Sequence, residues 1–306
     1  MARNDAGGCP TKRCIIVTSQ NGYEDKPPPA LIFFARDAKG NVSPAGEISG
    51  LKTELNIPWA VAMDSHYNVY VADWANAITV YAAGAEGNVA PIRTIAGTKT
   101  RLYRPTTIAV DAQGEVYVAS SQRNRVDIYA AGANGDVAPI REIRGIKTNL
   151  HYTWGIAFDA QSNLYVANEV PNNGSITVYS ANAKGDAAPI RTIEGSATKL
   201  AGPEGLAVDA SGYIYAVSQD NSVSIFAPGA NGNEAPVSSF SSGALYNAVG
   251  ISLDGHDNMY VTDVGSDGPP SIVVFAAGVK GNEGHVLRTI SGGKTKFIEP
   301  FGIVVR

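Results

Sequence analysis

The segment "VYVADWANAITVY", residues 69–81, reads as two short strands joined by a polar turn. β-Branched and aromatic residues, which favour pleated strands, fill both halves. Four variants follow, in which the strands barely change while the turn changes every time. They are "VYVASSQRNRVDIY" (116–129), "LYVANEVPNNGSITVY" (164–179), "IYAVSQDNSVSIF" (214–226) and "MYVTDVGSDGPPSIVVF" (259–275). The constant strands predict a repeated fold unit, and the turns are where we expect residues specific to function.

The repeat has a period of 45 to 50 residues. Its "YVA" tyrosine recurs at intervals of 47, 48, 50 and 45 residues, at Tyr70, Tyr117, Tyr165, Tyr215 and Tyr260. Each unit carries a "GIAVD"-like strand, the "YVA" strand, a third strand ending in Tyr or Phe, an "AAGAxGN" turn and a "PIRTI"-like strand. Four short antiparallel strands in such a period are the signature of a β-propeller blade.

The two ends of the chain complete one more blade. "CIIVTS" (14–19), "LIFFA" (31–35) and "GEISG" (46–50) match the second to fourth strands, and "PFGIVVR" (300–306) matches a first strand. Joining residues 14–50 to 300–306 closes the ring and removes exposed sheet edges. The sequence therefore predicts an all-β, six-bladed propeller that occupies residues 1–306 as a single domain.

Composition limits the partners. The 306 residues are 44% hydrophobic and 17% charged, enough for a large core, and the net charge of −4 argues against nucleic acid. The apolar runs are too short for a transmembrane helix, so we expect no membrane insertion. The N-terminal segment has no apolar signal core. We expect a secreted or periplasmic bacterial protein in mature form, with a cytoplasmic protein as the alternative. Cys9 and Cys14 are either a short-loop disulfide or two unpaired thiols.

Chain order assigns the loops to two faces. The turns after the first strands and the "AAGAxGN" turns share one face, and their composition indicates a structural role. The turns after the second strands and the crossovers between blades share the other, which we call the mouth face. In the outer strands, the isoleucines are expected to face inward, and the arginines to face solvent and discourage edge pairing. These arginines are Arg93, Arg141, Arg191 and Arg288.

The blade pattern resembles a known group. "PEGLAVDASGYIYAV" (203–217) follows "PxGIAVDxxGxxYVA", which is similar to the NHL-repeat six-bladed propellers, relatives of the regucalcin/gluconolactonase family. The resemblance covers nearly the whole chain and implies the architecture. For function it implies a range that includes lactonases, lyases, esterases and pure binding modules, with ligands held at the mouth face.

The resemblance also implies where a metal would sit. Gluconolactonase-like relatives hold a divalent metal at the channel mouth with Glu, Asn and Asp side chains, some of them just before the "GIA" motif. The matching positions here are Trp59, Thr106, Trp154, Glu204, Val249 and Phe301. Of these six, Glu204 alone has a side chain suited to a hard cation. A cation such as calcium is an open alternative that these positions do not support, and we predict no metal ligands.

Carboxylates at the ends of the second strands offer a second kind of site. Asp73, Asp263 and Glu169, with Asn168, are expected on the mouth face together with Glu204. They predict a carboxylate-based catalytic site, and the alternative is that they cap turns by bonding free backbone amides.

Histidine adds one candidate. His151 in "NLHYTW" is the histidine expected on the mouth face, and it is either a general base or an ordinary loop residue.

Aromatic residues are the strongest functional signal. All three tryptophans map to the mouth face, and aromatic rings with a few polar groups bind sugars, rings and acyl chains. The predicted ligand-binding residues are Trp59, Trp74, Trp154, Tyr152, Tyr103, Phe301, Asn168 and Glu169. We expect a binding module for a small organic or carbohydrate ligand. The alternatives are a lactonase- or lyase-like enzyme at the same mouth and a scaffold whose mouth face binds another protein.

Overall fold

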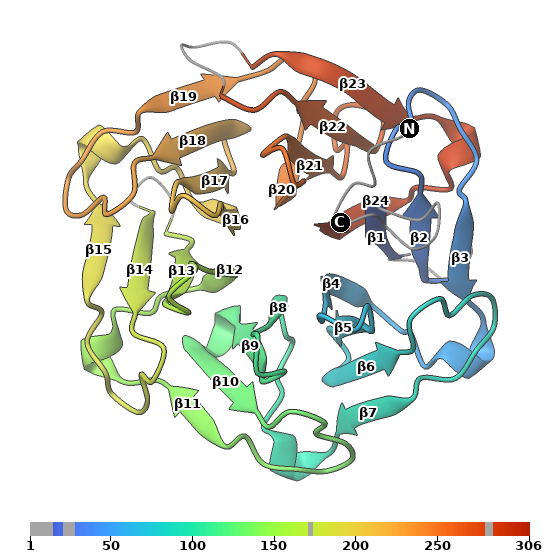
Figure 1. Ribbon diagram of the computed structural model, residues 1–306, viewed down its shortest axis with the longest axis horizontal. Helices are drawn as coiled ribbons and strands as arrows, with labels where there is room; N and C mark the ends of the chain where they lie inside the picture. The colour runs from blue at the N-terminus through green and yellow to red at the C-terminus, as the bar shows by residue number, and fades with distance from the viewer. Residues whose placement is uncertain (1–14, 21–27, 171–173, 279–283) are drawn as a thin grey trace, which may run out of the picture.

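Six four-stranded antiparallel sheets form a ring, as the repeat predicts (Figure 1). The computed structural model describes residues 15–20, 28–170, 174–278 and 284–306. Cys9 and Cys14, for which the sequence leaves a disulfide and two unpaired thiols open, lie outside these residues. In every blade the first strand is innermost and the fourth outermost, so the crossovers run from the rim back to the centre.

The strands of each blade follow chain order from the second blade onward. Blade 2 holds β4 (Pro58–Met63), β5 (Val69–Asp73), β6 (Ala77–Tyr81) and β7 (Arg93–Ala96). Blade 3 holds β8 (Thr107–Val110), β9 (Val116–Ser120), β10 (Arg125–Tyr129) and β11 (Arg141–Ile143). Blade 4 holds β12 (Thr153–Phe158), β13 (Leu164–Asn168), β14 (Ser175–Tyr179) and β15 (Arg191–Glu194). Blade 5 holds β16 (Pro203–Val208), β17 (Ile214–Ser218), β18 (Ser222–Phe226) and β19 (Ser238–Ser241). Blade 6 holds β20 (Ala248–Leu253), β21 (Met259–Asp263), β22 (Ser271–Phe275) and β23 (Val286–Ser291).

Blade 1 joins both ends of the chain. It consists of β24 (Glu299–Val305), β1 (Ile15–Gln20), β2 (Ala30–Phe34) and β3 (Gly46–Ser49). β24 pairs antiparallel with β1, with Ile15 opposite Val305, and the predicted closure is confirmed. Short 3-10 turns mark five crossovers and one strand turn: η1 (Leu51–Thr53), η2 (Thr98–Thr100), η3 (Ser121–Arg123), η4 (Ile146–Thr148), η5 (Ser196–Thr198) and η6 (Gly293–Thr295).

The core lies between neighbouring blades. Ile78 and Val80 of blade 2, for example, pack in one buried cluster with Val116 and Tyr129 of blade 3. Both faces of a middle strand therefore need apolar side chains, which explains the unbroken apolar runs in the sequence.

The outer edges are protected differently from the prediction. The loop with the "AAGAxGN" motif in one blade lies along the outer strand of the preceding blade. Gly87 N–H donates to Glu47 O at 2.7 Å, and Ser49 N–H donates to Gly87 O at 3.2 Å. Equivalent bridges join Ile95 to Gly135, Ile143 to Gly185, Ile193 to Gly232 and Ile290 to Gly40. Within the described residues, a neighbouring loop thus lies along five of the six outer edges.

The outer-strand arginines are bound rather than simply solvated. Arg93 Nη2 donates to the Tyr70 hydroxyl at 2.7 Å, and that hydroxyl donates to Asp64 Oδ2 at 3.2 Å. The same trio recurs in blades 4 and 6. The expectation that all "PIRTI" isoleucines face inward is also wrong, since Ile95 is buried but Ile92 is 52% exposed. Strand β7 begins only at Arg93, so Ile92 belongs to the loop.

Among the residues that the structure describes, no helix has the length and hydropathy to cross a membrane.

Candidate functional site

The six inner strands bring one residue each to the mouth of the central channel. A cavity of about 260 Å³ runs along the inner strands, and the six positions that precede the "GIA" motifs line it. They are Trp59, Thr106, Trp154, Glu204, Val249 and Phe301.

Local backbone geometry explains why these side chains reach the mouth. The pairing of first and second strands shifts register around Trp59, Glu204 and Val249, which are the extra residues of β-bulges. A bulge at a sheet rim redirects a side chain. The glycine after Trp154 allows two inner strands to approach closely, because a Cβ on Gly155 would lie 2.5 Å from the carbonyl oxygen of Glu204.

Four aromatic rings meet at the mouth, with Trp59 at their centre. Its ring centroid lies 4.2 Å from that of Phe301, 5.0 Å from Trp74 and 5.8 Å from Trp154. We call these four residues the aromatic cluster. Each of them is half-buried, so the rings pack on one another and still present surface to solvent. The structure thus brings together the three tryptophans that the sequence predicted on one face.

Two carboxylates share one amide donor beside this cluster. Gln219 Nε2 donates to Glu169 Oε1 at 2.6 Å and to Glu204 Oε1 at 3.0 Å. Burial raises the pKa of Glu204 to about 7, the Gln219 hydrogen bond opposes this, and the negative charge of Glu169 adds to it. Burial also raises the pKa of Glu169. Near neutral pH, Glu204 therefore populates both its acid and its carboxylate forms.

One polar group of the cluster is buried beside Glu169. The Trp154 indole N–H is close enough to Glu169 to lower the pKa of that carboxyl, yet Nε1 meets hydrogen-bond geometry with none of the described residues. The surrounding side chains shield Nε1 from solvent.

The predicted carboxylates Asp73 and Asp263 bond backbone amides instead of joining Glu204. Asp73 accepts from Asn56 N–H at 2.7 Å and Ala75 N–H at 2.9 Å. Asp263 accepts from Asn247 N–H at 3.1 Å and Gly265 N–H at 2.8 Å. Both are fully buried and neither lines the channel cavity. They occupy the turn-capping role that the sequence left as the alternative, and their catalytic role remains a prediction.

Asn168 has the same capping position in blade 4. Its Oδ1 accepts from His151 N–H at 3.0 Å, and its side chain is fully buried. His151 and Tyr152 are exposed, with ring centroids 5.4 Å apart. His151 lines a depression between blades 3 and 4 rather than the channel, so the structure separates it from Glu204.

Sequence reasoning missed Gln219, Arg104 and Arg123. Gln219 directly follows β17 and therefore lies at the mouth, which was the available signal. Arg104 and Arg123 extend the aromatic cluster outward: the Arg104 guanidinium carbon lies 4.8 Å from the Trp74 centroid, and that of Arg123 lies 4.3 Å from the centroid of the predicted residue Tyr103.

The metal site of gluconolactonase-like relatives is not reproduced by these residues. Aromatic and aliphatic side chains occupy four of the six mouth positions. Within the described ranges, no group of three or more His, Cys, Asp or Glu side chains is placed to hold a metal ion. A hard cation prefers six or more oxygen ligands, and the Glu204–Glu169 pair supplies too few.

Known proteins share the fold at low sequence identity. A protein of unknown function from Bacteroides caccae is 13% identical, with a TM-score of 0.65 over 96% of this chain and 99% of that chain. The WD40 β-propeller domain of Doa1 is 11% identical, with a TM-score of 0.58 over 91% and 87%. Streptogramin B lyase is 11% identical, with a TM-score of 0.52 over 74% and 68%. No curated protein matches the sequence significantly.

One family model matches the sequence itself. Described as the SMP-30/Gluconolactonase/LRE-like region, it covers residues 85–237, half of the 306 residues. The matched segment contains Trp154, Glu169, Glu204 and Gln219. By this match, which agrees with the six-bladed ring, the chain belongs to the SMP-30/gluconolactonase/LRE-like family.

Proposed function

We propose that this protein binds a small organic or carbohydrate ligand at the mouth of its central channel. The observation that carries the proposal is the contact of Trp59 with three other half-buried aromatic rings at the rim of the cavity. Exposed aromatic faces bind the apolar faces of sugars and planar rings. A cluster without this role has no need to leave four aromatic side chains partly in water.

Polar groups beside the rings support an oriented ligand. The carboxyls of Glu169 and Glu204 and the amide of Gln219 lie there, and the carboxyl of Glu204 accepts or donates according to its protonation state. A few such groups within an apolar wall are typical of small-molecule sites, where they fix the direction of the ligand.

Intrinsic fluorescence tests the proposal directly, because every tryptophan of the chain belongs to the aromatic cluster. A bound ligand should change the emission, and Trp59→Ala should weaken binding about tenfold or more, as expected for loss of an aromatic anchor. Tyr213→Ala is the control, since Tyr213 is a 38% exposed aromatic residue on the opposite face. A broad panel of glycans and aromatic compounds that leaves the emission unchanged contradicts the proposal.

A second candidate function is acid–base catalysis of the lactonase or lyase type. Glu204 favours it, because a carboxyl with a pKa of about 7 exchanges protons readily at neutral pH. The family description names gluconolactonase, and one protein similar in fold is a lyase.

The experiment is hydrolysis of a lactone panel by the wild type, Glu204→Gln and the control Asp220→Asn. Asp220 is an exposed carboxylate that bonds Ser222, beside the site but outside it. Turnover lost in the first variant and kept in the second favours catalysis. Turnover kept in both, or absent from the wild type, leaves binding as the function.

A further inference from the structure

A row of alternating aromatic and cationic side chains leads outward from the aromatic cluster. Trp74 stacks on the Arg104 guanidinium at 4.8 Å, and Tyr103 lies 5.7 Å from Arg104 and 4.3 Å from Arg123. We call Trp74, Arg104, Tyr103 and Arg123 the cationic row. Both arginines are exposed, so their guanidinium groups face solvent across blades 2 and 3.

The charges of this row lack carboxylate partners in the part of the chain that the structure describes. Within the described ranges, neither Arg104 nor Arg123 has a carboxylate at ion-pair distance. The Arg104 guanidinium donates instead to the neutral amide oxygen of Gln122, at 3.4 Å.

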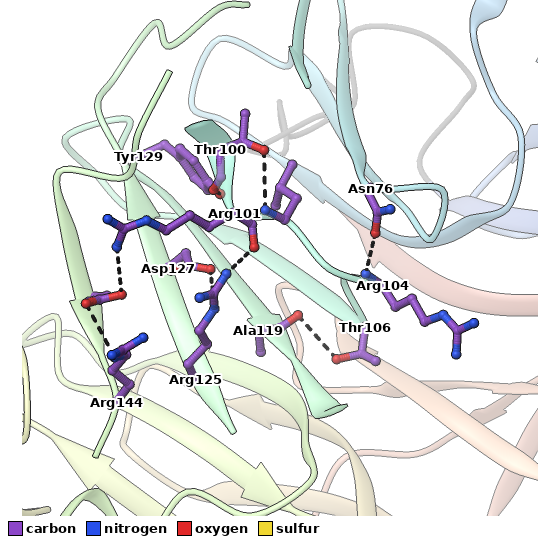
Figure 2. Close-up of polar contacts among 12 residues, drawn as sticks. Asn76, Thr100, Arg101, Arg104, Thr106, Ala119, Arg125, Asp127, Tyr129 and Arg144 are labelled. Atoms are coloured by element: carbon purple, nitrogen blue, oxygen red, sulfur yellow. Dashed lines mark hydrogen bonds and ion pairs between the residues drawn. The ribbon is translucent and has the colours of Figure 1, made fainter. Parts of the chain in front are cut away.

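Neighbouring arginines behave differently. Arg101 and Arg144 both contact Glu142, at 3.3 and 3.5 Å. Arg125 Nε lies 2.8 Å from the buried Asp127. Figure 2 shows these side chains reaching toward their partners, whereas the side chain of Arg104 extends away from them. Two unpaired guanidinium groups beside paired ones indicate a surface that takes its anion from a ligand.

The backbone holds Arg104 in place. Arg104 has φ 45°, a left-handed conformation that costs free energy outside glycine. Its N–H donates to Asn76 Oδ1 at 2.7 Å, and Asn76 ends the turn that carries Trp74 (Figure 2). The arginine and the ring beneath it are therefore fixed by one turn, which reduces the entropy lost on binding.

The mouth therefore carries carboxylates on one side and guanidinium groups on the other. Glu204 and Glu169 border the cluster on the side of blades 4 and 5, and the cationic row borders it on the side of blades 2 and 3. The chain as a whole carries −4, so an attraction for anions at this side of the mouth comes from the local arginines and not from the net charge. A ligand with an acidic group at one position and hydroxyl groups elsewhere matches this arrangement.

We infer that the ligand is an acidic saccharide, whose sugar rings contact the exposed surface of the aromatic cluster and whose carboxylate groups pair with Arg104 and Arg123. The planar guanidinium fork matches a carboxylate. This inference rests on the proposed function and names its ligand class.

The experiment compares saccharides of equal length by calorimetry: oligogalacturonate, a neutral galactose oligomer and a sulfated galactose oligomer. We expect oligogalacturonate to bind at least about tenfold more tightly than the neutral oligomer, because it gains a charge-assisted contact. Its affinity should fall as salt rises. Arg104→Gln with Arg123→Gln should abolish that preference. The control pair Arg101→Gln with Arg144→Gln removes the same charge from the same blade, and the preference should remain.

The outcomes separate the two claims. Equal binding of neutral and acidic oligomers overturns the acidic-saccharide inference and leaves the proposed function standing. Preference for the sulfated over the carboxylated oligomer overturns the assignment to a carboxylate. Equal losses in both double variants overturn a contact role for Arg104 and Arg123. Failure of all three oligomers to bind overturns this inference, whereas the proposed function then depends on the wider panel.

Discussion

The ring centroids of Trp59 and Phe301 lie 4.2 Å apart, although the two residues belong to the first strands of blades 2 and 1. Phe301 is on β24, the strand that closes the ring against β1. Since a residue from each end of the chain is needed, the aromatic cluster is complete only in the closed propeller.

Gly302 makes this contact possible, which gives the first prediction. A Cβ on Gly302 would lie 2.6 Å from the Cα atom of Ala60, so Gly302→Ala must push β24 away from β4. We expect a loss of about 2 kcal/mol or more in unfolding free energy, as in other overpacked sites, and a shift in tryptophan emission. Urea unfolding measures the first. Gly243→Ala is the control, because a Cβ there meets nothing within 4 Å, and equal losses in both variants would contradict the account.

Glu204 should make stability depend on pH. Burial raises its pKa to about 7 from the ordinary 4.5, so the folded state binds more protons than the unfolded state between these values. The contribution of Glu204 to the free energy of unfolding is fully present below about pH 4.5 and is lost as pH rises through about 7. Glu204→Gln, which stays neutral, should therefore be more stable than the wild type at pH 8, by at most about 3 kcal/mol, and the gap should close toward pH 4.5.

Urea unfolding at pH 5 and pH 8 measures that gap. Glu194→Gln, at an exposed glutamate of β15, serves as the control for loss of one charge. A Glu204→Gln gap that is the same at both pH values would mean that the carboxyl is not held in the buried position described.

Breaking the buried ion pair of blade 3 is expected to lower the free energy of unfolding. Arg125 Nε lies 2.8 Å from Asp127 Oδ2. The two groups form an ion pair, but their alignment does not meet hydrogen-bond geometry. The Arg125 side chain is 10% exposed and that of Asp127 is fully buried. Asp127→Ala leaves the guanidinium buried without its partner and should cost about 3 kcal/mol or more by chemical denaturation.

Blade 4 supplies the matched rescue. Ser175 and Thr177 occupy the equivalent positions on β14. The double variant Arg125→Ser with Asp127→Thr copies them and should recover most of the stability lost in Asp127→Ala. A double variant as unstable as the single one would show that the pair does more than satisfy its own charges.

The sequence predicted the ring well, because a period of 45 to 50 residues with four strand signals has few architectural solutions. It also predicted which inner-strand residues line the mouth, since register follows from the repeat. It did not decide whether Asp73 acts in chemistry or caps a turn, because that depends on where backbone amides point.

Contacts between blades were the least predictable part. Gln219 reaches Glu169 of the preceding blade, and Arg104 of blade 3 lies on Trp74 of blade 2. Both depend on the direction of long side chains, which a periodic pattern does not encode. The pairing of five outer strands with the next blade's loop was missed for a related reason: the repeat describes one blade, whereas this pairing exists only between two.

The central claim is that a ligand binds on the three tryptophans, and their indole N–H signals in a ¹H–¹⁵N NMR spectrum test it most directly. The chain has three tryptophans, and Trp59 contacts both of the others, so the spectrum has three such signals from one site. We predict that a binding saccharide moves all three with a single dissociation constant, because the three rings lie in one cluster. A saccharide that binds by calorimetry while the three signals stay unmoved would contradict the account.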